Sequence, residues 1–397
     1  MAISPWVERA NRVLMKNVGR LPVVFSHGTG AKLYDVNGRE YLDFLSGIAV
    51  HAVGHSHPAV VAALKKQAEK IIHVSNFFCL EEQILLAEKL TALSGLERVF
   101  FANSGAEANE AAIKLARKYG QTRLGGKYEI ITAYHSFHGR TMGALAATGQ
   151  PKYQEAFRPL PAGFRYAHFN DLASWEAAIT PQTCAVLIEL VQGEGGVVPI
   201  DPDFFHGLAA LCRRHGLLLM VDEVQTGLGR TGKVFAWEHL GIKPDIMTLA
   251  KALGGGLPLG AMLAKEEVAA VFEPGDHSTT VGGGGMAFAA ALAILQIMVE
   301  EDLPGRAAHL GAELKAEFQS WQQELPVIKE VRGWGLLLAL ELAIPAQPVM
   351  RSCLEQGLIV NAVSPTALRL APPLNIDEDE LKRGLAILKQ ALATAAE

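Results

Sequence analysis

The chain has 397 residues, half of them hydrophobic, and its 36 basic and 41 acidic side chains give a formal net charge of −5. So many apolar residues can build a sizeable core, and the length predicts either two or three domains or one large domain with a smaller one. A mildly acidic chain without a basic run is not expected to bind nucleic acid or an anionic membrane as its main partner.

The composition also bears on where the protein works. Its four cysteines are scattered without a CxxC pair, which favours a reducing compartment and predicts no disulfide framework. Residues 1–13 carry Glu8, Arg9 and Arg12 and have no apolar core, unlike a secretory signal. The most apolar helical stretch, residues 286–299, is shorter than the ~20 residues that a membrane span needs. We therefore expect a cytoplasmic location and no membrane partner.

Residues 1–57 are expected to form an N-terminal arm that contributes to the smaller domain. Hydrophobic and polar residues alternate over 30–45, and the Asn-Gly pair in the middle of this stretch is a strong hairpin signal. His55 and His57 lie in the loop that follows. A metal site there is disfavoured because no further ligands with suitable spacing lie nearby, and no metal is predicted elsewhere in the chain.

Residues 58–287 alternate helical and strand-like segments. This alternation predicts a large α/β domain with a mostly parallel sheet that is covered on both faces. Strands are expected at 98–102, 129–133, 185–190, 217–221, 246–249 and 260–264, and helices at 59–70, 81–93, 203–215 and from about residue 105 through 119.

Residues 288–397 follow a different pattern. After the apolar helix at 286–299, which we interpret as buried, the chain shows two further helices, short strands and a final helix that starts at residue 377. The strands are expected at 331–342, 358–362 and 368–370. This mixture predicts a separate, smaller α+β domain at the C-terminus.

Two predicted strands end in charged residues that suit a cofactor site. The strand at 246–249 is followed by Lys251 and by glycines at 254–256, which allow tight turns close to a ligand. The strand at 217–221 runs into Asp222. Ligands of parallel α/β sheets bind beyond the carboxyl ends of strands, and pyridoxal phosphate needs a lysine for its Schiff base and an acid at its pyridine nitrogen. Taken singly, Lys251 is more simply interpreted as a loop lysine and Asp222 as a capping aspartate.

Two further strand ends carry candidate ligand-binding residues. Ser104-Gly105-Ala106 lies at a strand-to-helix junction, which suits either a phosphate site or an ordinary helix cap. Phe137 follows the next strand and can stack on a cofactor ring or merely pack in the core. Arg140 nearby has the geometry to clamp a carboxylate with two hydrogen bonds.

Four polar residues give weaker signals. Glu194 lies between glycines after a strand and is either a turn residue or a positioned carboxylate. Thr279 and Thr280 precede a run of glycines, which is compatible with phosphate contact. Arg369 lies inside an apolar strand, where an arginine is usually paired, so it is either structural or a carboxylate binder.

Together and in this order, these segments resemble the class III (subgroup II) pyridoxal-phosphate aminotransferases of fold type I. The resemblance is closest to those that act on N-acetylornithine, near those for ornithine and 4-aminobutyrate, and it covers nearly the whole chain. It implies that residues 58–287 form the large domain that binds pyridoxal 5'-phosphate. The segments that carry it are 45–50, 103–110, 137–141, 192–196, 222–227, 229–232 and 249–256.

The resemblance implies a role for each candidate at the cofactor. Lys251 would form the Schiff base and then move the proton, and Asp222 would pair with the pyridine nitrogen. The remaining cofactor contacts are implied for Gln225 at the phenolic oxygen, Phe137 and Val224 on the two ring faces, and Ser104, Gly105 and Ala106 at the phosphate. Thr280 would reach the phosphate of the neighbouring subunit, so the resemblance implies a homodimer with shared active sites.

The implied substrate-binding residues are Arg140, Glu194, Thr279 and Arg369. In this arrangement the two arginines bind substrate carboxylates, and Glu194 masks Arg369 when no carboxylate is there.

The implied activity transfers the terminal amine of N2-acetylornithine to 2-oxoglutarate, giving N-acetylglutamate 5-semialdehyde and glutamate in arginine biosynthesis. One alternative is another terminal amine, from 4-aminobutyrate, ornithine, acetyllysine or succinylornithine. Ile48 stands where ornithine enzymes have a tyrosine, which counts against free ornithine. The other alternative is a regulatory protein that binds the cofactor without turnover, and the intact set of Lys251, Asp222 and Arg140 counts against it.

Four features depart from the family pattern. Relatives often have a tyrosine where this chain has Val18, an asparagine at His51, a proline at Leu190 and Asn-Pro at Gly284-Gly285. None of these positions belongs to the implied cofactor set, but Val18 and His51 leave the amino donor open among the related amines.

Overall fold

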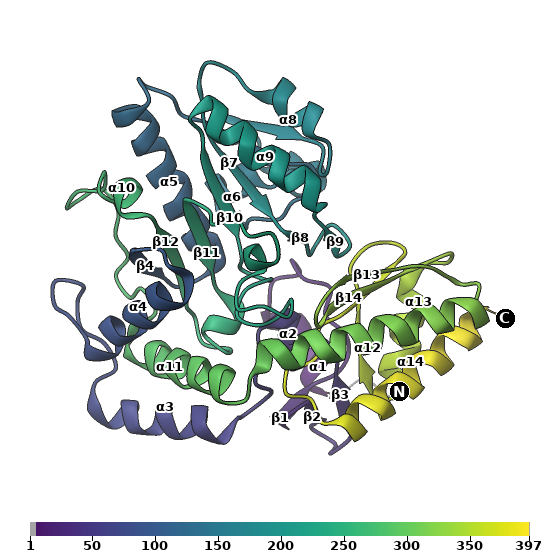
Figure 1. Cartoon of the computed structure of the whole chain (residues 1–397). Helices are drawn as coiled ribbons and strands as arrows, with labels where there is room; N and C mark the ends of the chain where they lie inside the picture. Colours follow the sequence, from purple (N-terminus) through teal and green to yellow (C-terminus); the bar gives the residue numbers. More distant parts are fainter. Residues whose placement is uncertain (1–4, 397) are drawn as a thin grey trace.

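A seven-stranded mixed sheet forms the centre of the computed structural model, which describes residues 5–396 (Figure 1). The strand order is β4-β12-β11-β10-β7-β5-β6. Only β12 runs antiparallel to its two neighbours, and the other pairs are parallel. The strands are β4 (Arg98–Ala102), β5 (Glu129–Ala133), β6 (Phe164–Ala167), β7 (Thr183–Glu189), β10 (Leu218–Asp222), β11 (Ile246–Leu249) and β12 (Gly260–Ala264).

Helices cover both faces of this sheet, which explains why β7 and β10 are buried along their whole length and mostly apolar. Successive residues of a strand point to opposite faces. Ala185 and Leu187 of β7 accordingly pack with the helix α5 (Gly105–Arg123), whereas Val186 and Ile188 pack with the helices on the other face. Those helices are α8 (Leu172–Ala178) and α9 (Pro202–His215). The predicted α/β fold with a mostly parallel sheet is confirmed.

Three helices pack together beside this sheet, and short helical segments connect the strands. α11 lies against both α3 and α4, and most of its residues are buried, as expected for the apolar stretch at 286–299. The three helices are α3 (Pro58–Lys70), α4 (Glu81–Ser94) and α11 (Gly284–Glu300). The shorter segments are α2 (Ser46–Ala49), α6 (Met142–Ala147), α7 (Pro151–Gln154), η1 (Glu155–Phe157), η2 (Ala236–His239), η3 (Lys251–Leu253) and α10 (Glu266–Ala269).

The N-terminal and C-terminal segments build two smaller four-stranded sheets and four helices. The antiparallel sheet has the order β13-β14-β17-β16, and the other has the order β1-β2-β3-β15. The strand β15 of the second sheet pairs in parallel with β3, so residues near 358 join the N-terminal hairpin. The elements are β1 (Phe25–Thr29), β2 (Lys32–Asp35), β3 (Glu40–Asp43), β13 (Ile328–Trp334), β14 (Leu337–Leu342), β15 (Leu358–Ile359), β16 (Asn361–Ala362), β17 (Ala367–Leu370), α1 (Pro5–Val13), α12 (Leu303–Glu324), α13 (Ala346–Glu355) and α14 (Glu378–Ala396).

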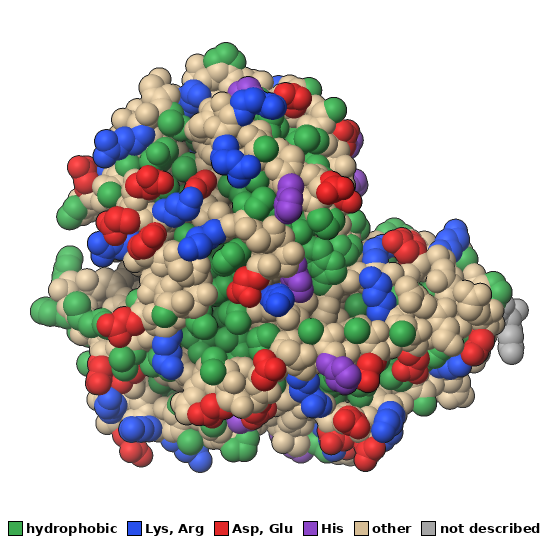
Figure 2. Space-filling model, in the orientation of Figure 1, with side chains coloured by type: hydrophobic (Ala, Val, Ile, Leu, Met, Phe, Trp, Pro, Cys, Tyr) green, Lys and Arg blue, Asp and Glu red, His purple; other side chains and the backbone are tan. Residues whose placement is uncertain are grey.

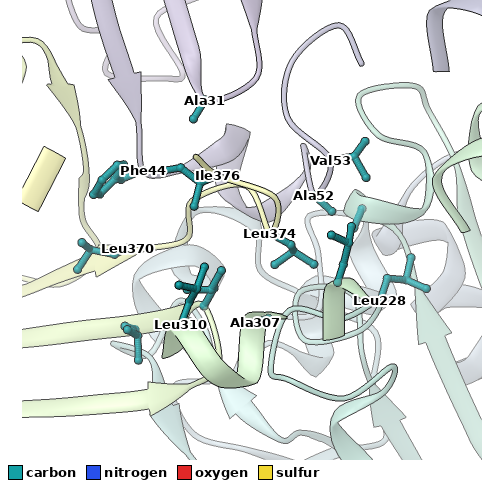
Figure 3. Close-up of a cluster of buried hydrophobic side chains, with 14 of the residues drawn as sticks. Ala31, Phe44, Ala52, Val53, Leu228, Ala307, Leu310, Leu370, Leu374 and Ile376 are labelled. Atoms are coloured by element: carbon teal, nitrogen blue, oxygen red, sulfur yellow. The ribbon is translucent and has the colours of Figure 1, made fainter. Parts of the chain in front are cut away.

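A shared apolar cluster joins these parts of the chain (Figure 3). Phe44 from the N-terminal segment, Leu228 from the loop after β10, Leu310 from α12 and Ile376 near the C-terminus all belong to it. Each is 6% exposed or less. Because side chains from distant segments are buried in one cluster, the small sheets and the central sheet are held against each other.

The surface and the helices show two further features of the part of the chain that the structure describes. Basic and acidic side chains are interspersed over the face seen in Figure 2. Over residues 5–396, none of the helices combines the length and the apolar character needed to cross a bilayer. Within the same range no group of three or more His, Cys, Asp or Glu side chains has the arrangement of a metal site, and His55 instead pairs with Asp43 at 2.8 Å.

Candidate active site

A cavity of about 530 Å³ opens where the carboxyl ends of the parallel strands meet. Its volume lies in the range of small-molecule sites. Most of the residues predicted from the sequence line it, although they come from segments between residues 103 and 251. They are Ser104, Gly105, Ala106, Phe137, Arg140, Glu194, Asp222, Val224, Gln225 and Lys251.

Lys251 follows β11 and lies in the wall of this cavity. Its backbone has a φ of +44°, a left-handed conformation that is unfavourable for a residue with a side chain and is often found at functional sites. Burial lowers the pKa of its ammonium, and the nearby Asp222 carboxylate opposes this shift only in part. Among residues 5–396, no carboxylate forms an ion pair with its Nζ. Lys251 is therefore an unpaired amine that loses its proton more readily than an ordinary lysine.

Asp222 ends β10 and is held by three donors. Asn109 Nδ2 and His138 Nδ1 each donate to its Oδ2 at 2.8 Å, and the Val224 N–H donates to its Oδ1 at 3.0 Å. Thr248 in turn donates to the amide oxygen of Asn109 at 2.8 Å. Hydrogen bonds to a carboxylate favour its charged form. The arrangement presents an oriented negative charge, which suits a protonated ring nitrogen.

Asn109 and His138 were missed as site residues by the sequence interpretation. His138 is buried, and Asn109 lies on α5 one turn after the predicted phosphate loop. A polar residue among the alanines of a buried helix face is a signal that such a residue has a specific partner. The sequence does not say that this partner is Asp222, which is 113 positions away.

The N-terminus of α5 forms a cradle for an anion. Ser104 is the N-cap and accepts from the Glu107 N–H at 3.2 Å. The next two residues, Gly105 and Ala106, begin the helix, where backbone N–H groups lack intrahelical acceptors and the helix dipole is positive. A Cβ atom at Gly105 would lie 2.8 Å from Val224 Cγ1. The capping and the phosphate-binding interpretations are thus compatible, because Ser104 caps the helix while the glycine keeps the cradle open.

Phe137 and Arg140 lie on the loop that follows β5. The backbone N–H of Phe137 donates to Glu189 Oε2 at 3.0 Å, which anchors this loop to the end of β7. The Arg140 guanidinium lies 3.9 Å from the ring centroid of Tyr153 and 5.4 Å from that of Phe137. Arg140 is exposed and forms no ion pair within residues 5–396. Stacking on two rings orients the guanidinium and leaves its donors available to a carboxylate.

Arg369 lies next to the cavity and forms hydrogen bonds through both of its terminal nitrogens. Its Nη1 donates to Glu194 Oε1 at 2.6 Å and lies 3.4 Å from Gln225 Oε1, and its Nη2 donates to Asn361 Oδ1 at 2.8 Å. The Arg369 side chain is 1% exposed, whereas that of Glu194 is 26% exposed. Asn361 faces Arg369 in the β16–β17 pair and is a third residue that the sequence interpretation missed. The structure therefore brings Glu194 and Arg369 together as a pair whose acidic partner is the more accessible one.

The two threonines before the glycine run lie differently. Thr279 Oγ1 accepts from Asn103 Nδ2 at 3.1 Å, and Asn103 lines the cavity. Thr280 is exposed and does not line the cavity of its own chain. A contact between Thr280 and a phosphate in a neighbouring subunit stays a prediction.

The residues present fit pyridoxal phosphate. The unpaired Lys251 offers an amine, Asp222 offers a fixed carboxylate, and the N-terminus of α5 offers free N–H groups beside a glycine that leaves room for a phosphate. Phe137 and Val224 add apolar surface for an aromatic ring. These are the groups that this cofactor needs, a Schiff-base lysine and a partner for the pyridinium nitrogen among them.

Comparisons with known proteins agree with this chemistry. A family model described as "Aminotransferase class-III" matches residues 13–392. The acetylornithine aminotransferase of Gloeobacter violaceus is 50% identical over 383 residues, which are 96% of each chain. That of Methanocaldococcus jannaschii is 47% identical over 382 residues, again 96% of each chain.

Solved structures share the fold over nearly the whole chain. The ornithine aminotransferase of Toxoplasma gondii has a TM-score of 0.95 at 33% identity and covers 98% of this chain and 94% of its own. A second structure of that enzyme has pyridoxal phosphate at partial occupancy in its active site. The N-acetylornithine aminotransferase of Stenotrophomonas maltophilia has a TM-score of 0.84 at 38% identity and covers 98% of this chain and 100% of its own.

Proposed function

The chain belongs to the class-III aminotransferase family, and on this premise we propose that it transfers the terminal amine of N2-acetylornithine to 2-oxoglutarate. It is a pyridoxal-phosphate-dependent enzyme of fold type I. The proposed products are N-acetylglutamate 5-semialdehyde and glutamate, a step of arginine biosynthesis. The names of the acetylornithine aminotransferase relatives support this donor.

The observation that carries the proposal is the Glu194–Arg369 ion pair of 2.6 Å beside the cavity. A free arginine there would attract the α-carboxylate of an amino acid. It would thereby place the α-amine, and not a terminal amine, near the cofactor carbon that Lys251 would hold. With Glu194 in place that charge is neutralised, so a donor that reacts through its terminal amine fits better. The acceptor 2-oxoglutarate has one carboxylate to displace Glu194 and a second for Arg140.

This displacement is reasonable because the pair is unequal. Arg369 is buried and keeps Asn361 as a partner when Glu194 leaves, and Glu194 is accessible enough to swing aside. Desolvation offsets much of the attraction in such pairs, so a substrate carboxylate that makes equivalent hydrogen bonds can replace Glu194 at modest cost.

The cofactor, when bound, supplies a carbonyl carbon that reacts with amines and a ring that withdraws electrons. Asp222, oriented by its hydrogen bonds with Asn109 and His138, would pair with the ring nitrogen and favour its protonated form. Phe137 and Val224 would pack on the two ring faces, and Gln225 would reach the phenolic oxygen. Ser104, Gly105 and Ala106 would hold the phosphate.

Lys251 has two proposed tasks at its Nζ atom. It would hold the cofactor until an amine donor replaces it, and it would then take the proton from the donor's reacting carbon. An ordinary lysine has a pKa of about 10.4 and is almost fully protonated at neutral pH. Burial lowers the pKa of Lys251, which raises the fraction of the neutral amine that both tasks require.

We also propose that the enzyme is a cytoplasmic homodimer. All four cysteines are unpaired, as expected in a reducing compartment. Ile72, Phe77 and Phe78 expose 65%, 92% and 66% of their surface between α3 and α4. Asn76 in the same segment donates to the Thr279 carbonyl oxygen, so this apolar surface adjoins the segment that carries Thr280. Such a surface suits a partner subunit.

A panel of amino donors tests the proposed function. The holoenzyme would be mixed with acetylornithine, ornithine, 4-aminobutyrate, acetyllysine or succinylornithine, and the absorbance change of the bound cofactor would be followed in a single turnover. We expect the highest kcat/KM for acetylornithine. A rival donor that exceeds acetylornithine by roughly tenfold, about 1.4 kcal/mol of transition-state stabilisation, would replace it in the proposal.

A further inference from the structure

Glu189 is a buried acid at the cavity that the proposed reaction does not yet use. It is the last residue of β7, is 7% exposed and lines the cavity. In the parallel pair of β7 and β10 it lies directly opposite Asp222. Neighbouring strands are only about 4.8 Å apart, and residues in register point to the same face. Two carboxyl groups are therefore placed side by side away from bulk water.

Two adjacent buried carboxyl groups do not both ionise, because each negative charge disfavours the other. The hydrogen bonds decide which of them keeps the charge. Asp222 accepts from the side chains of Asn109 and His138 and from the Val224 N–H. Glu189 accepts at Oε2 from the Phe137 N–H. Asp222 accepts more hydrogen bonds than Glu189 does, so a negative charge is better stabilised on Asp222 and the proton belongs on Glu189.

The electrostatic surroundings of Glu189 agree with this assignment. Burial raises the pKa of its carboxyl well above the ordinary range, and the Asp222 carboxylate adds to the increase. The Phe137 N–H, Lys251 and the Gly193 N–H oppose the shift to a smaller degree.

We propose that Glu189 is a positioning residue that is held as a neutral carboxylic acid and donates an O–H hydrogen bond into the cofactor cavity. Its Oε2 accepts from Phe137 and so fixes the loop whose ring lines the cavity. The Gly193 N–H is a second backbone partner of this carboxyl. Because Glu189 lines the cavity, its protonated oxygen is available to an acceptor oxygen of the bound cofactor or substrate. A neutral Glu189 also leaves Asp222 as the one ionised member of the pair. The function of the O–H group rests on the proposed transamination, whereas the protonation state of Glu189 does not.

The protonation state is tested on the cofactor-free protein by infrared spectroscopy. Wild type is expected to show the carbonyl band of a protonated carboxylic acid that persists at mildly alkaline pH, far above the ordinary glutamate pKa of about 4.3. This band should be absent from Glu189→Gln. Glu223→Gln is the matched control, because Glu223 is also buried but its pKa is raised only to about 7 and it does not line the cavity. Its substitution should leave the alkaline band in place.

The hydrogen-bonding role is tested by cofactor affinity and by the pH dependence of the bound cofactor's absorbance. Glu189→Gln keeps a neutral donor and an acceptor, so both readouts should stay within about threefold of wild type. Glu189→Ala loses both groups, and its cofactor affinity should fall roughly tenfold, as expected when buried partners are left unpaired. Thermal unfolding of both variants separates this loss from misfolding.

Two results would overturn the inference. One is the absence of a persistent carboxylic acid band in wild type, which would mean that Glu189 is ionised. The other is a Glu189→Gln variant as impaired as Glu189→Ala, which would mean that a charged carboxylate is required. If the donor panel excludes acetylornithine while the band is present, the proposed substrate fails and the assignment of Glu189 stands.

Discussion

At the scale of single residues, the cavity contains one unpaired amine among several fixed partners. Asp222, Arg369 and Glu194 each have hydrogen-bond partners within the chain, whereas Lys251 has none at its Nζ in the described part and adopts a strained backbone conformation. The strained backbone and the unpaired amine both lower stability. Their presence is explained if Lys251 has to react with the cofactor.

Lys251→Ala is expected to abolish covalent retention of the cofactor and to lower turnover by several orders of magnitude, because nucleophile and proton carrier are one group. Borohydride treatment followed by mass spectrometry should attach the cofactor to wild type and not to the variant. Lys265→Ala is a suitable control, since Lys265 pairs with Asp245 away from the cavity. Near-normal turnover in the Lys251 variant would refute the assignment.

The Glu194–Arg369 pair predicts opposite effects on the two half-reactions. Glu194→Ala leaves Arg369 held by Asn361 and should raise the rate with glutamate more than that with acetylornithine. Arg369→Ala should lower kcat/KM for 2-oxoglutarate by roughly 100-fold, because charged hydrogen bonds contribute about 1.5–3 kcal/mol each, with a smaller effect on acetylornithine. Single-turnover kinetics of each half-reaction measure this. The surface arginine variant Arg383→Ala is the control, and equal losses in both halves would rule out the switch.

Glu223 predicts a pH dependence of stability. Its buried carboxyl has a pKa raised to about 7, chiefly by burial. The folded state then binds more protons than the unfolded state between about pH 4.3 and 7, so the free energy of unfolding should fall as the pH rises through this window, by about 4 kcal/mol from this group. Urea unfolding at a series of pH values tests this, and the dependence should be much weaker in Glu223→Gln. A variant with the same pH profile as wild type would contradict the prediction.

At the scale of elements, the junction between β4 and α5 shows how a short glycine-bearing turn makes a ligand site. The helix needs a cap at its first turn, and Ser104 supplies it from its own side chain. Gly105 then allows the helix end to approach Val224 closely. The cradle therefore depends on local capping and on a tertiary contact at the same residue.

Gly105→Ala is expected to weaken cofactor affinity roughly tenfold, because the added methyl would lie 2.8 Å from Val224 Cγ1 and would displace the helix end from the phosphate. Equilibrium titration of the apoenzyme with pyridoxal phosphate measures the effect. Gly19→Ala serves as a control, since a Cβ atom there meets nothing within 4 Å. Unchanged affinity in Gly105→Ala would show that the cradle is not at this helix end.

The two glycines that begin α11 have a local structural reason. Gly284 has a φ of +71°, and the Gly285 N–H donates to the Ile72 carbonyl oxygen at 3.1 Å. A proline at position 285 would lack this N–H, and a Cβ atom there would lie 2.9 Å from the Ile71 carbonyl oxygen. The departure from Asn-Pro thus fits the way this segment packs on the end of α3.

At the scale of the whole molecule, we propose that residues 1–57 and 288–397 form the small domain, of which residues 1–4 and 397 lie outside the described part, and that residues 58–287 form the large one. The pairing of β3 with β15 supports grouping the two termini. The apolar cluster that Phe44, Leu228 and Ile376 share supports a close junction between the domains. Arg369 on the small-domain side meets Glu194 on the other, so the substrate site depends on this junction.

The proposed dimer predicts that two variants, each defective at a different active-site residue, restore one intact site when they form a heterodimer. If Thr280 contacts the phosphate of the partner subunit, a heterodimer of Lys251→Ala and Thr280→Ala chains contains one site with both defects and one intact site. Half of the sites should then bind cofactor with wild-type affinity, while the Thr280→Ala homodimer should bind roughly tenfold more weakly. Cofactor titration of purified heterodimers distinguishes the cases. A heterodimer without any wild-type site would mean that Thr280 acts within its own chain, and an active monomer would exclude a shared site.

Local patterns were sufficient to predict most elements from the sequence. Apolar periodicity and turn residues depend on near neighbours in the chain, and they located the strands β4, β5, β7, β10, β11 and β12 and the helices α3, α4, α5, α9 and α11 to within a few residues. The strand β6 was missed, because it has only four residues and only Ala167 among them is fully buried. The strand-end positions of Lys251 and Asp222 were predicted in the same local way.

Only the tertiary structure decided which side chains meet in the site. Asp222 lies beside Glu189 because β10 is the neighbour of β7, and it meets Asn109 because α5 crosses that part of the sheet. Arg369 pairs with Glu194 across 175 positions. The local pattern of a strand or helix specifies which face of the element is buried but not which element covers that face, so the partners of buried polar groups are determined by packing between distant segments.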